Sequence, residues 1–329
     1  MQQQESTVAA TPSLQTNRLY YFRRYAIPVI SSLTGFMAIA CIGSLLIMYF
    51  TRHRNAVSPL LPYPNIVCYQ RSCGCPNSEN GISFIPRIVG GQQAPAYIYP
   101  WLVSLTDRYR VDPFCAGFII SPNVILTAAH CLNNRNPDRI QILSKIHDLR
   151  DFKGDRHDID QWIIHSEYRN NDSMHLNDIA LVKVQQDFAT DLQPCCLPRK
   201  KSNVFPRPKT QAVISGWGAV LTKPTSRNSP VLQHVVVPIV DHKNTRCYHS
   251  IADKSRQICA GYDTLAIDSC SGDSGAPLLV VQHDGDEQYF VAAGIVSYGN
   301  KQCDASISSG VYTRISFYVD WIEATLNYL

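Results

Sequence analysis

A serine flanked by small residues lies in the stretch DSCSGDSGAPLL, residues 268–279, where Ser274 stands between an aspartate and a glycine. A serine hydroxyl is a weak nucleophile unless a nearby base removes its proton, so catalysis would also require a histidine and a carboxylate. Runs of Gly, Ser and Asp are equally typical of turns. The stretch by itself does not distinguish a catalytic serine from a turn.

Two further short motifs supply the missing groups, with His130 in LTAAHC and Asp178 in NDIAL. In such a set the histidine accepts the serine proton, and the carboxylate orients the imidazole and stabilises its cation. Another histidine, His165 in HSEY, has a serine and a glutamate beside it. Neighbouring side chains on an extended chain point apart, so we do not expect that trio to act together.

With these three motifs in the order His, Asp, Ser, residues 88–329 resemble the trypsin-like (chymotrypsin-fold) serine proteases. The resemblance implies a serine endopeptidase with a double six-stranded antiparallel β-barrel, catalysed by His130, Asp178 and Ser274 without a cofactor or a metal. It also implies an oxyanion hole formed by the backbone N–H groups of Gly272 and Ser274. Gly272 suits that role because a side chain at its position would crowd the approach to the hole. A catalytically idle homologue that acts as a binding or adhesion module is the alternative, although no catalytic residue type is missing.

The apolar pattern predicts the same fold class independently. Short apolar runs such as WLVSL, NVILTAA and QAVISGW alternate with turn-forming residues from residue 88 onward. This pattern is typical of an all-β domain. Near the end of the chain, Val319, Ile322 and Leu326 recur at helical spacing, so we expect one C-terminal helix.

The stretch FIPRIVGG places Arg87 directly before Ile88. By resemblance this is the activation site of a zymogen, cut either by another protease or by the enzyme itself. Cleavage would free an amino group on Ile88 that pairs with the Asp273 carboxylate and orders the active site. A buried charge without its partner costs about 3–5 kcal/mol, which would keep the uncut form mostly inactive.

The resemblance also assigns a specificity pocket. Asp268 lies six residues before Ser274, and a carboxylate at the base of a narrow pocket favours substrates with Arg or Lys before the scissile bond. Small residues at Gly299 and Gly310 would keep the mouth of that pocket open. Ser297 would bond the catalytic aspartate, and its backbone, with that of Gly299, would pair with an extended substrate.

The twelve cysteines are irregularly spaced, which indicates disulfides and an oxidising compartment. The resemblance implies three pairs within the protease domain: Cys115 with Cys131, Cys247 with Cys259, and Cys270 with Cys303. A further pair that is frequent in the family is absent at both of its positions, which Ala212 and Val280 occupy.

The pairing of five other cysteines stays open, and one of them must be left over: Cys68, Cys73, Cys75, Cys195 and Cys196. Cys196 matches better than Cys195 the position that tethers the catalytic domain to its stem in related enzymes. Such a tether would keep the domain attached after activation.

Residues 26–50 contain no charge, and a helix of that length exceeds a hydrocarbon core of about 30 Å. We interpret them as a signal-anchor helix between a cytosolic tail, residues 1–25, and a stem or propeptide, residues 51–87. Eleven of the twelve cysteines follow this span, so the catalytic domain is expected outside the cell. The arrangement resembles the type II transmembrane serine proteases, single-pass proteins of the cell membrane, and a soluble secreted protease is the alternative.

The net charge of +4 gives no reason to expect a nucleic-acid partner. Asn171, in NDS, is the single N-glycosylation sequon and suggests a glycoprotein. Five aspartates between residues 148 and 160 stand where some relatives of the resembled family bind calcium. We interpret that segment as a solvated acidic loop.

Overall fold

The computed structural model describes residues 63–66, 68, 71–77, 82–84, 92–171, 174–218, 229–262, 272–299 and 310–329. The chain divides into two compact units, Met1–Leu61 and Pro62–Leu329, and the described residues belong to the second unit. The predicted tail and membrane helix therefore lie outside the described residues. No helix within the described ranges is long and apolar enough to cross a membrane.

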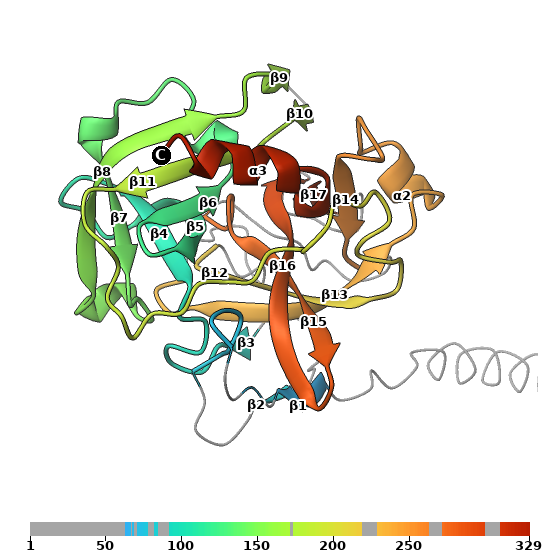
Figure 1. The fold of residues 1–329 in the computed structure, drawn as a ribbon, viewed down its shortest axis with the longest axis horizontal. Helices are drawn as coiled ribbons and strands as arrows, with labels where there is room; N and C mark the ends of the chain where they lie inside the picture. The colour runs from blue at the N-terminus through green and yellow to red at the C-terminus, as the bar shows by residue number, and fades with distance from the viewer. Residues whose placement is uncertain are drawn as a thin grey trace, which may run out of the picture. The chain divides into compact units, whose positions relative to one another are not determined.

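The first β-barrel closes with six antiparallel strands in the order β11, β6, β5, β4, β7 and β8 (Figure 1). β11 pairs with both β6 and β8, which completes the ring. The strands are β4 (Leu102–Asp107), β5 (Pro113–Ser121), β6 (Val124–Thr127), β7 (Ile140–Ser144), β8 (Asp155–Ile164) and β11 (Ala180–Val184).

The second β-barrel is also six-stranded, because β12 pairs with β15 on one side and with β13 on the other. β3 (Gln92–Gln93) adds to the edge of β13. The barrel strands are β12 (Gln211–Gly216), β13 (Gln233–Val240), β14 (Gln257–Ala260), β15 (Pro277–Asp284), β16 (Glu287–Tyr298) and β17 (Gly310–Arg314). The all-β double barrel expected from the sequence is thus confirmed.

The expected C-terminal helix is α3 (Val319–Leu326), with Val319 and Ile322 buried and Leu326 partly buried against the core. The remaining elements are short: β1 (Tyr63–Ile66), β2 (Ile82–Phe84), β9 (Arg169–Asn171), β10 (Met174–Leu176), α2 (Thr245–Tyr248) and the 3₁₀ turns η1 (Ala129–Cys131), η2 (Pro137–Arg139), η3 (Leu149–Asp151) and η4 (Ile315–Phe317).

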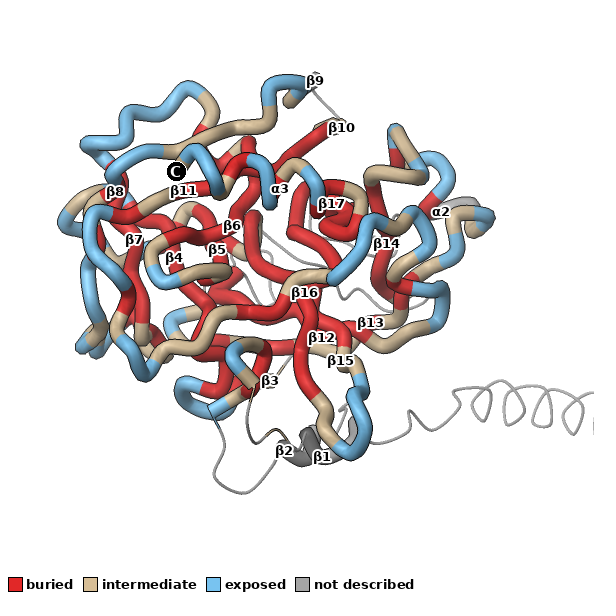
Figure 2. Tube along the Cα trace, in the orientation of Figure 1, coloured by how far each residue is buried: buried red, intermediate tan, exposed pale blue. Residues whose placement is uncertain are grey.

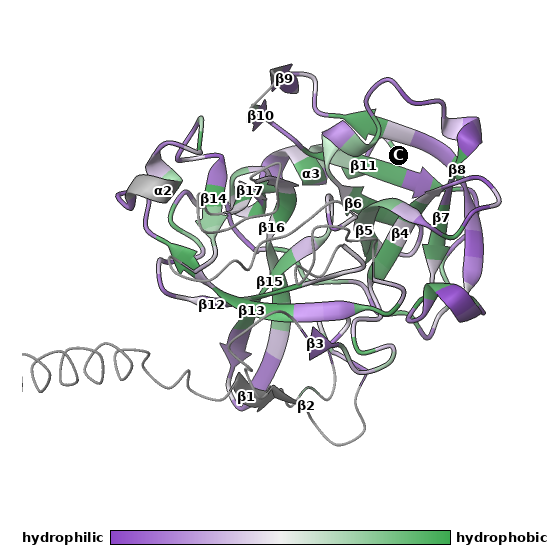
Figure 3. Cartoon of the chain, turned by 180° about the vertical axis from the view of Figure 1, so that it is seen from behind, coloured by the Kyte–Doolittle hydropathy of each residue, from purple (hydrophilic) through white to green (hydrophobic). Residues whose placement is uncertain are grey.

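The core continues through both barrels, as the buried central strands in Figure 2 show. The central strands are also coloured largely as hydrophobic residues in Figure 3. Trp101 and Trp217 are among the largest fully buried side chains of this core. Since the core spans the junction, it fixes one barrel against the other, and residues from both can form one site.

Candidate active site

Adjacent strands of the first barrel bring His130 and Asp178 together. His130 lies in η1, just after β6, and Asp178 lies just before β11. Ala180 of β11 pairs with Thr127 of β6, so the two ends meet. The Nδ1 atom of His130 lies 2.8 Å from Oδ2 of Asp178, and the His130 backbone N–H donates to Oδ1 at 2.9 Å.

The second barrel supports the same carboxylate. The hydroxyl of Ser297 on β16 donates to Oδ2 of Asp178 at 2.5 Å, and the hydroxyl of Thr313 on β17 donates to the Asp178 carbonyl oxygen at 2.8 Å. The Asp178 side chain is fully buried, whereas that of His130 is 19% exposed. With Nδ1–H donating to Asp178, the Nε2 atom of His130 is the nitrogen left to accept a proton.

The electrostatics favour an ionised aspartate beside a basic imidazole. Burial opposes ionisation of Asp178, but the charge and hydrogen bonds of His130, together with the hydrogen bond of Ser297, outweigh it and keep the pKa of the carboxyl group below its ordinary value. Burial likewise lowers the pKa of His130, and Arg135 acts in the same direction. The charge and hydrogen bond of Asp178 are stronger and raise the pKa of His130 overall.

Ser274 approaches His130 from the second barrel through its backbone. It lies in the turn before β15, and its carbonyl oxygen accepts from the Ala116 N–H of β5 at 2.7 Å. The Sγ atom of Cys131 lies 3.7 Å from that carbonyl oxygen and 3.7 Å from Nε2 of His130. Both candidate residues therefore contact the same sulfur atom at the junction between the barrels.

Two glycines shape the turn that carries Ser274. Gly272 and Gly275 have φ angles of +104° and +86°, in the left-handed region that favours glycine. A Cβ atom on Gly275 would lie 2.2 Å from the Ala116 carbonyl oxygen and 2.3 Å from Oγ1 of Thr127. The Gly275 N–H donates to the Val296 carbonyl at 2.9 Å. Residue 275 must be small because the first barrel lies so close to its backbone.

Asp273 faces the loop after β12. The Gly218 N–H donates to Oδ1 of Asp273 at 2.7 Å. Cβ atoms on Gly216 and Gly218 would lie 2.0 Å and 2.2 Å from the Asp273 carboxylate oxygens. Sequence analysis did not single out these glycines, although the SGWG stretch contains both.

Comparison with known proteins identifies the family of this constellation. The family model described as Trypsin matches residues 88–322. The chain belongs to the trypsin family.

Chymotrypsin-C of Bos taurus is 32% identical over 278 residues, which cover 80% of this chain and 97% of that protein. Among solved structures, neuropsin, a serine protease expressed in the limbic system of mouse brain, aligns with a TM-score of 0.60 and 28% identity, over 73% of this chain and all of that one. The protein is accordingly a trypsin-like serine endopeptidase.

Part of the expected specificity pocket of the protease is described. Ser297 is buried near the end of β16, and Gly299 follows that strand. Tyr298 pairs with Val311 across β16 and β17, so Gly299 and Gly310 lie at the same end of this strand pair. Other predicted residues lie outside the described residues: Arg87, Ile88, Asp268, Cys270 and Cys303, together with the side chain of Asn171.

The disulfides of the protease include two expected pairs, Cys115–Cys131 and Cys247–Cys259. Of the five cysteines left open, Cys73 pairs with Cys196 and Cys68 with Cys75. Cys195 is the one left over, and it is buried. The segment that contains Cys73 is thus joined to the protease domain through Cys196, the cysteine that sequence analysis favoured.

His175 is a neighbour of the catalytic candidates that sequence analysis missed. Its ring stacks on that of His130, with centroids 5.1 Å apart and planes inclined by 22°. The Tyr168 hydroxyl lies 3.2 Å from Nδ1 of His175, and the Tyr298 ring meets it edge-on. In the sequence, the signal for His175 was its position three residues before Asp178. The sequence does not show in which direction the side chain of a single histidine points.

Two other histidines of the protease, His165 and His157, pack against residues that have no proposed catalytic role. His165, the member of the local trio, packs against Trp321 of the C-terminal helix, with ring centroids 5.1 Å apart. His157 lies 2.9 Å from the hydroxyl of Ser144, but both residues are buried inside the first barrel. Burial is the main cause that lowers the pKa of His157. Because His157 and Ser144 are both buried, a substrate has no access to them.

The five aspartates of the acidic segment all form ion pairs with basic residues. The pairs are Asp148–Arg150, Asp151–Lys153, Asp155–Lys145, Asp158–Arg108 and Asp160–Lys183. Their charges are therefore compensated by side chains of the protein.

Proposed function

We propose that this protein is a membrane-anchored serine endopeptidase zymogen, activated by cleavage after Arg87, that hydrolyses peptide bonds after Arg or Lys. The observation that carries its catalytic part is the buried Asp178 carboxylate bonded to His130, with the Ser274 carbonyl and the His130 ring both contacting the sulfur of Cys131. Membership of the trypsin family supports the same interpretation.

In the proposed mechanism, Nε2 of His130 takes the hydroxyl proton of Ser274 while the serine oxygen attacks the substrate carbonyl. Asp178 stabilises the imidazolium that forms. His130 then returns the proton to the leaving amine, and a water molecule hydrolyses the acyl-enzyme by the same route. The raised pKa of His130 suits this sequence because it makes the imidazole a better base.

The negative oxygen of the tetrahedral intermediate would be stabilised by the backbone N–H groups of Gly272 and Ser274. Each such donor contributes about 100- to 1,000-fold in rate. The positive φ of Gly272 supports this assignment because it orients the backbone at that position in a way that other residues rarely adopt.

The preference for Arg or Lys rests on Asp268, which by resemblance would form the base of the pocket. Of that pocket the structure describes Gly299 and Gly310, which lie at the same end of the β16–β17 pair. For activation, the new amino group of Ile88 would pair with Asp273. Two observations support that pairing: the Asp273 carboxylate lies against Gly216 and Gly218, where a side chain would not fit, and it already accepts one backbone N–H.

The anchor rests on the uncharged span 26–50, and the disulfides support an oxidising, extracellular location for the domain. The Cys73–Cys196 bond would hold the activated domain to its stem and hence to the cell membrane. Its partners would be protein and peptide substrates together with an activating protease, which can be the enzyme itself.

Hydrolysis of small amide substrates tests this function. The full chain, treated with a protease that cuts after Arg87, should cleave an Arg-amide at least about 100-fold better than a Phe-amide, since a buried carboxylate discriminates strongly by charge. Ser274→Ala should abolish turnover, and Arg87→Gln should leave an uncut, inactive chain. Normal activity in either variant would contradict the proposal.

A further inference from the structure

We propose that residues 71–77 form a noncovalent clip, called here the stem clip, that binds the stem to the protease domain independently of the Cys73–Cys196 disulfide. The clip touches three separate parts of the domain: the segment before Cys196, the β15–β16 hairpin and the loop before β4. Its consequence after activation rests on the proposed cleavage at Arg87, but the attachment itself does not.

Gly74 forms the centre of the clip. Its N–H donates to the Pro194 carbonyl and its carbonyl accepts from the Phe290 N–H, both at 2.9 Å. Gly74 has a φ of +75°, and a Cβ atom there would lie 2.3 Å from the Phe290 carbonyl oxygen and 2.9 Å from Sγ of Cys196. Removing the clip would break this hydrogen bond of the Phe290 N–H.

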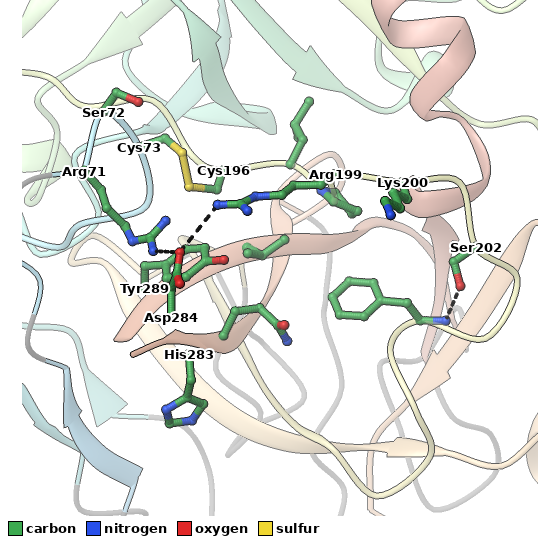
Figure 4. A pocket seen from close by; sticks show the side chains of 15 residues that line it. Arg71, Ser72, Cys73, Cys196, Arg199, Lys200, Ser202, His283, Asp284 and Tyr289 are labelled. Carbon is green, nitrogen blue, oxygen red and sulfur yellow. Dashed lines mark hydrogen bonds and ion pairs between the residues drawn. A yellow bond between two sulfur atoms is a disulfide. The ribbon is translucent and has the colours of Figure 1, made fainter. Parts of the chain in front are cut away.

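Arg71 supplies the side-chain contact. Its guanidinium pairs with Asp284 and lies 3.8 Å from the Tyr289 ring centroid (Figure 4). It also pairs with Glu287 at 2.9 Å. Exposed ion pairs usually stabilise proteins little. The Arg71 side chain, however, is only 15% exposed and meets two carboxylates and a ring at once. All three partners belong to the β15–β16 hairpin.

The rest of the clip limits its freedom before binding. Asn77 donates its N–H to the Ile98 carbonyl at 3.3 Å, and the Cys68–Cys75 bond closes a short loop around Arg71. A segment that is already constrained loses less entropy when it binds. The clip therefore combines backbone hydrogen bonds, charge and preorganisation in a seven-residue segment.

The neighbouring surface makes Arg71 a suitable position for a test. The Arg199 guanidinium lies 3.7 Å from the Asp284 carboxylate, and the Arg199 side chain is 75% exposed. Both residues line a pocket of about 730 Å³. When Arg71 is replaced, Asp284 keeps a basic neighbour, and the partly exposed side chain of Glu287 can be solvated by water. The substitution should weaken the clip without unfolding the domain.

The test uses the full chain, solubilised in detergent, with an amino-terminal tag and the recognition sequence of a site-specific protease in place of residues 85–87. After cutting, the tagged stem is held on beads and the release of the catalytic domain is followed over time. Cys73→Ser with Cys196→Ser removes the disulfide. In this background we expect slow release, and Arg71→Gln should accelerate release by about tenfold.

The matched control is Arg110→Gln, because Arg110 forms an exposed pair with Asp112 elsewhere on the surface. It should leave release unchanged. Arg71→Lys should give an intermediate rate, since lysine keeps the charge but lacks the planar guanidinium. Unchanged cleavage of an Arg-amide would show that each variant is folded.

Immediate release from the double-cysteine variant, or equal release rates with and without the Arg71→Gln substitution, would overturn the clip. The added protease makes the cut, so neither result depends on Arg87 as the natural activation site. A failure of that proposal would appear separately, as activity in the Arg87→Gln chain.

Discussion

Asp178 is the residue on which the geometry of the catalytic pair depends. Its fully buried carboxylate accepts from the His130 ring, the His130 backbone and the Ser297 hydroxyl. Hydrogen bonds to the charged form keep an otherwise costly buried charge stable. The same bonds fix the imidazole tautomer in which Nε2 is the nitrogen that accepts a proton.

Replacing Asp178 with Asn should therefore lower kcat by about 10,000-fold with little effect on KM, because the amide stabilises the wrong tautomer of His130. Steady-state kinetics with an Arg-amide measures both constants. The control is Asp160→Asn, whose carboxylate lies 3.7 Å from Lys183 and is half exposed. A kcat within tenfold of the parent for Asp178→Asn would contradict the assigned role.

The pH dependence of activity follows from His130. The neutral imidazole is the active base, so kcat/KM falls as the pH drops through its pKa. Because Asp178 raises that pKa above the ordinary value of 6.5, the acid midpoint of kcat/KM should lie above pH 6.5. A profile between pH 5 and pH 9 measures it, and a midpoint clearly below 6.5 would show that the pairing is weaker than the geometry indicates.

At the residue scale, sequence reasoning worked where a motif is local. His130, Asp178 and Ser274 each stand in a short stretch of characteristic types, and the barrel strands bring those stretches together. It failed for His175, because the direction of that ring depends on the β9–β10 hairpin and on the hydroxyl of Tyr168. Such contacts between side chains leave no periodic signal in the sequence.

At the element scale, the turn before β15 must approach the first barrel very closely. Gly275→Ala should destabilise the fold by about 2–5 kcal/mol, combining a left-handed φ with a steric clash. Gly285 provides the comparison, since its φ is +60° but a Cβ atom there would meet nothing within 4 Å. Gly285→Ala should cost only about 1–2 kcal/mol.

Denaturant unfolding measures both free energies of unfolding. Similar values for the two variants would show that the turn relaxes away from Ala116 and that close approach does not explain the glycine. We also expect kcat to fall in Gly275→Ala but not in Gly285→Ala, because Ser274 is adjacent to Gly275.

The pairing of β12 with β15 would accommodate a disulfide that this chain lacks. The family resemblance suggested a cysteine pair at the positions of Ala212 and Val280, and the structure pairs these residues directly across the two strands. Cross-strand partners have Cα atoms about 4.5–5.5 Å apart, within the range that a disulfide bridges. Ala212→Cys with Val280→Cys should therefore form a bond and stabilise the oxidised protein by about 2–4 kcal/mol.

Thermal unfolding with and without reductant checks this expectation. The midpoint should rise only in the oxidised double variant, and each single variant serves as a control. A double variant that stays reduced, or that loses stability on oxidation, would show that the strand register differs from the one described.

At the scale of the whole molecule, the active site exists only because two barrels meet. The first barrel supplies His130 and Asp178, and the second supplies Ser274, Ser297 and Thr313. The all-β class was predictable from alternating short strands. The pairing of five cysteines was not, since it depends on how the stem folds back onto β16.

The membrane topology makes a prediction that does not depend on catalysis. If residues 26–50 anchor the chain with its amino terminus in the cytosol, Asn171 at the end of β9 is on the opposite side, where glycosylation occurs. Treatment with a glycosidase should increase the electrophoretic mobility of the protein from cells. Asn171→Gln should already show that mobility untreated, because Asn171 stands in the single sequon.

The same cells locate the other end of the chain. A tag at the amino terminus should resist protease added outside intact cells, while the catalytic domain should be accessible to it. A tag that is digested in intact cells, or a chain without any shift on deglycosylation, would contradict this topology. A tag lost from the chain during secretion, with the glycan retained, would instead favour removal of the apolar segment and a soluble protease.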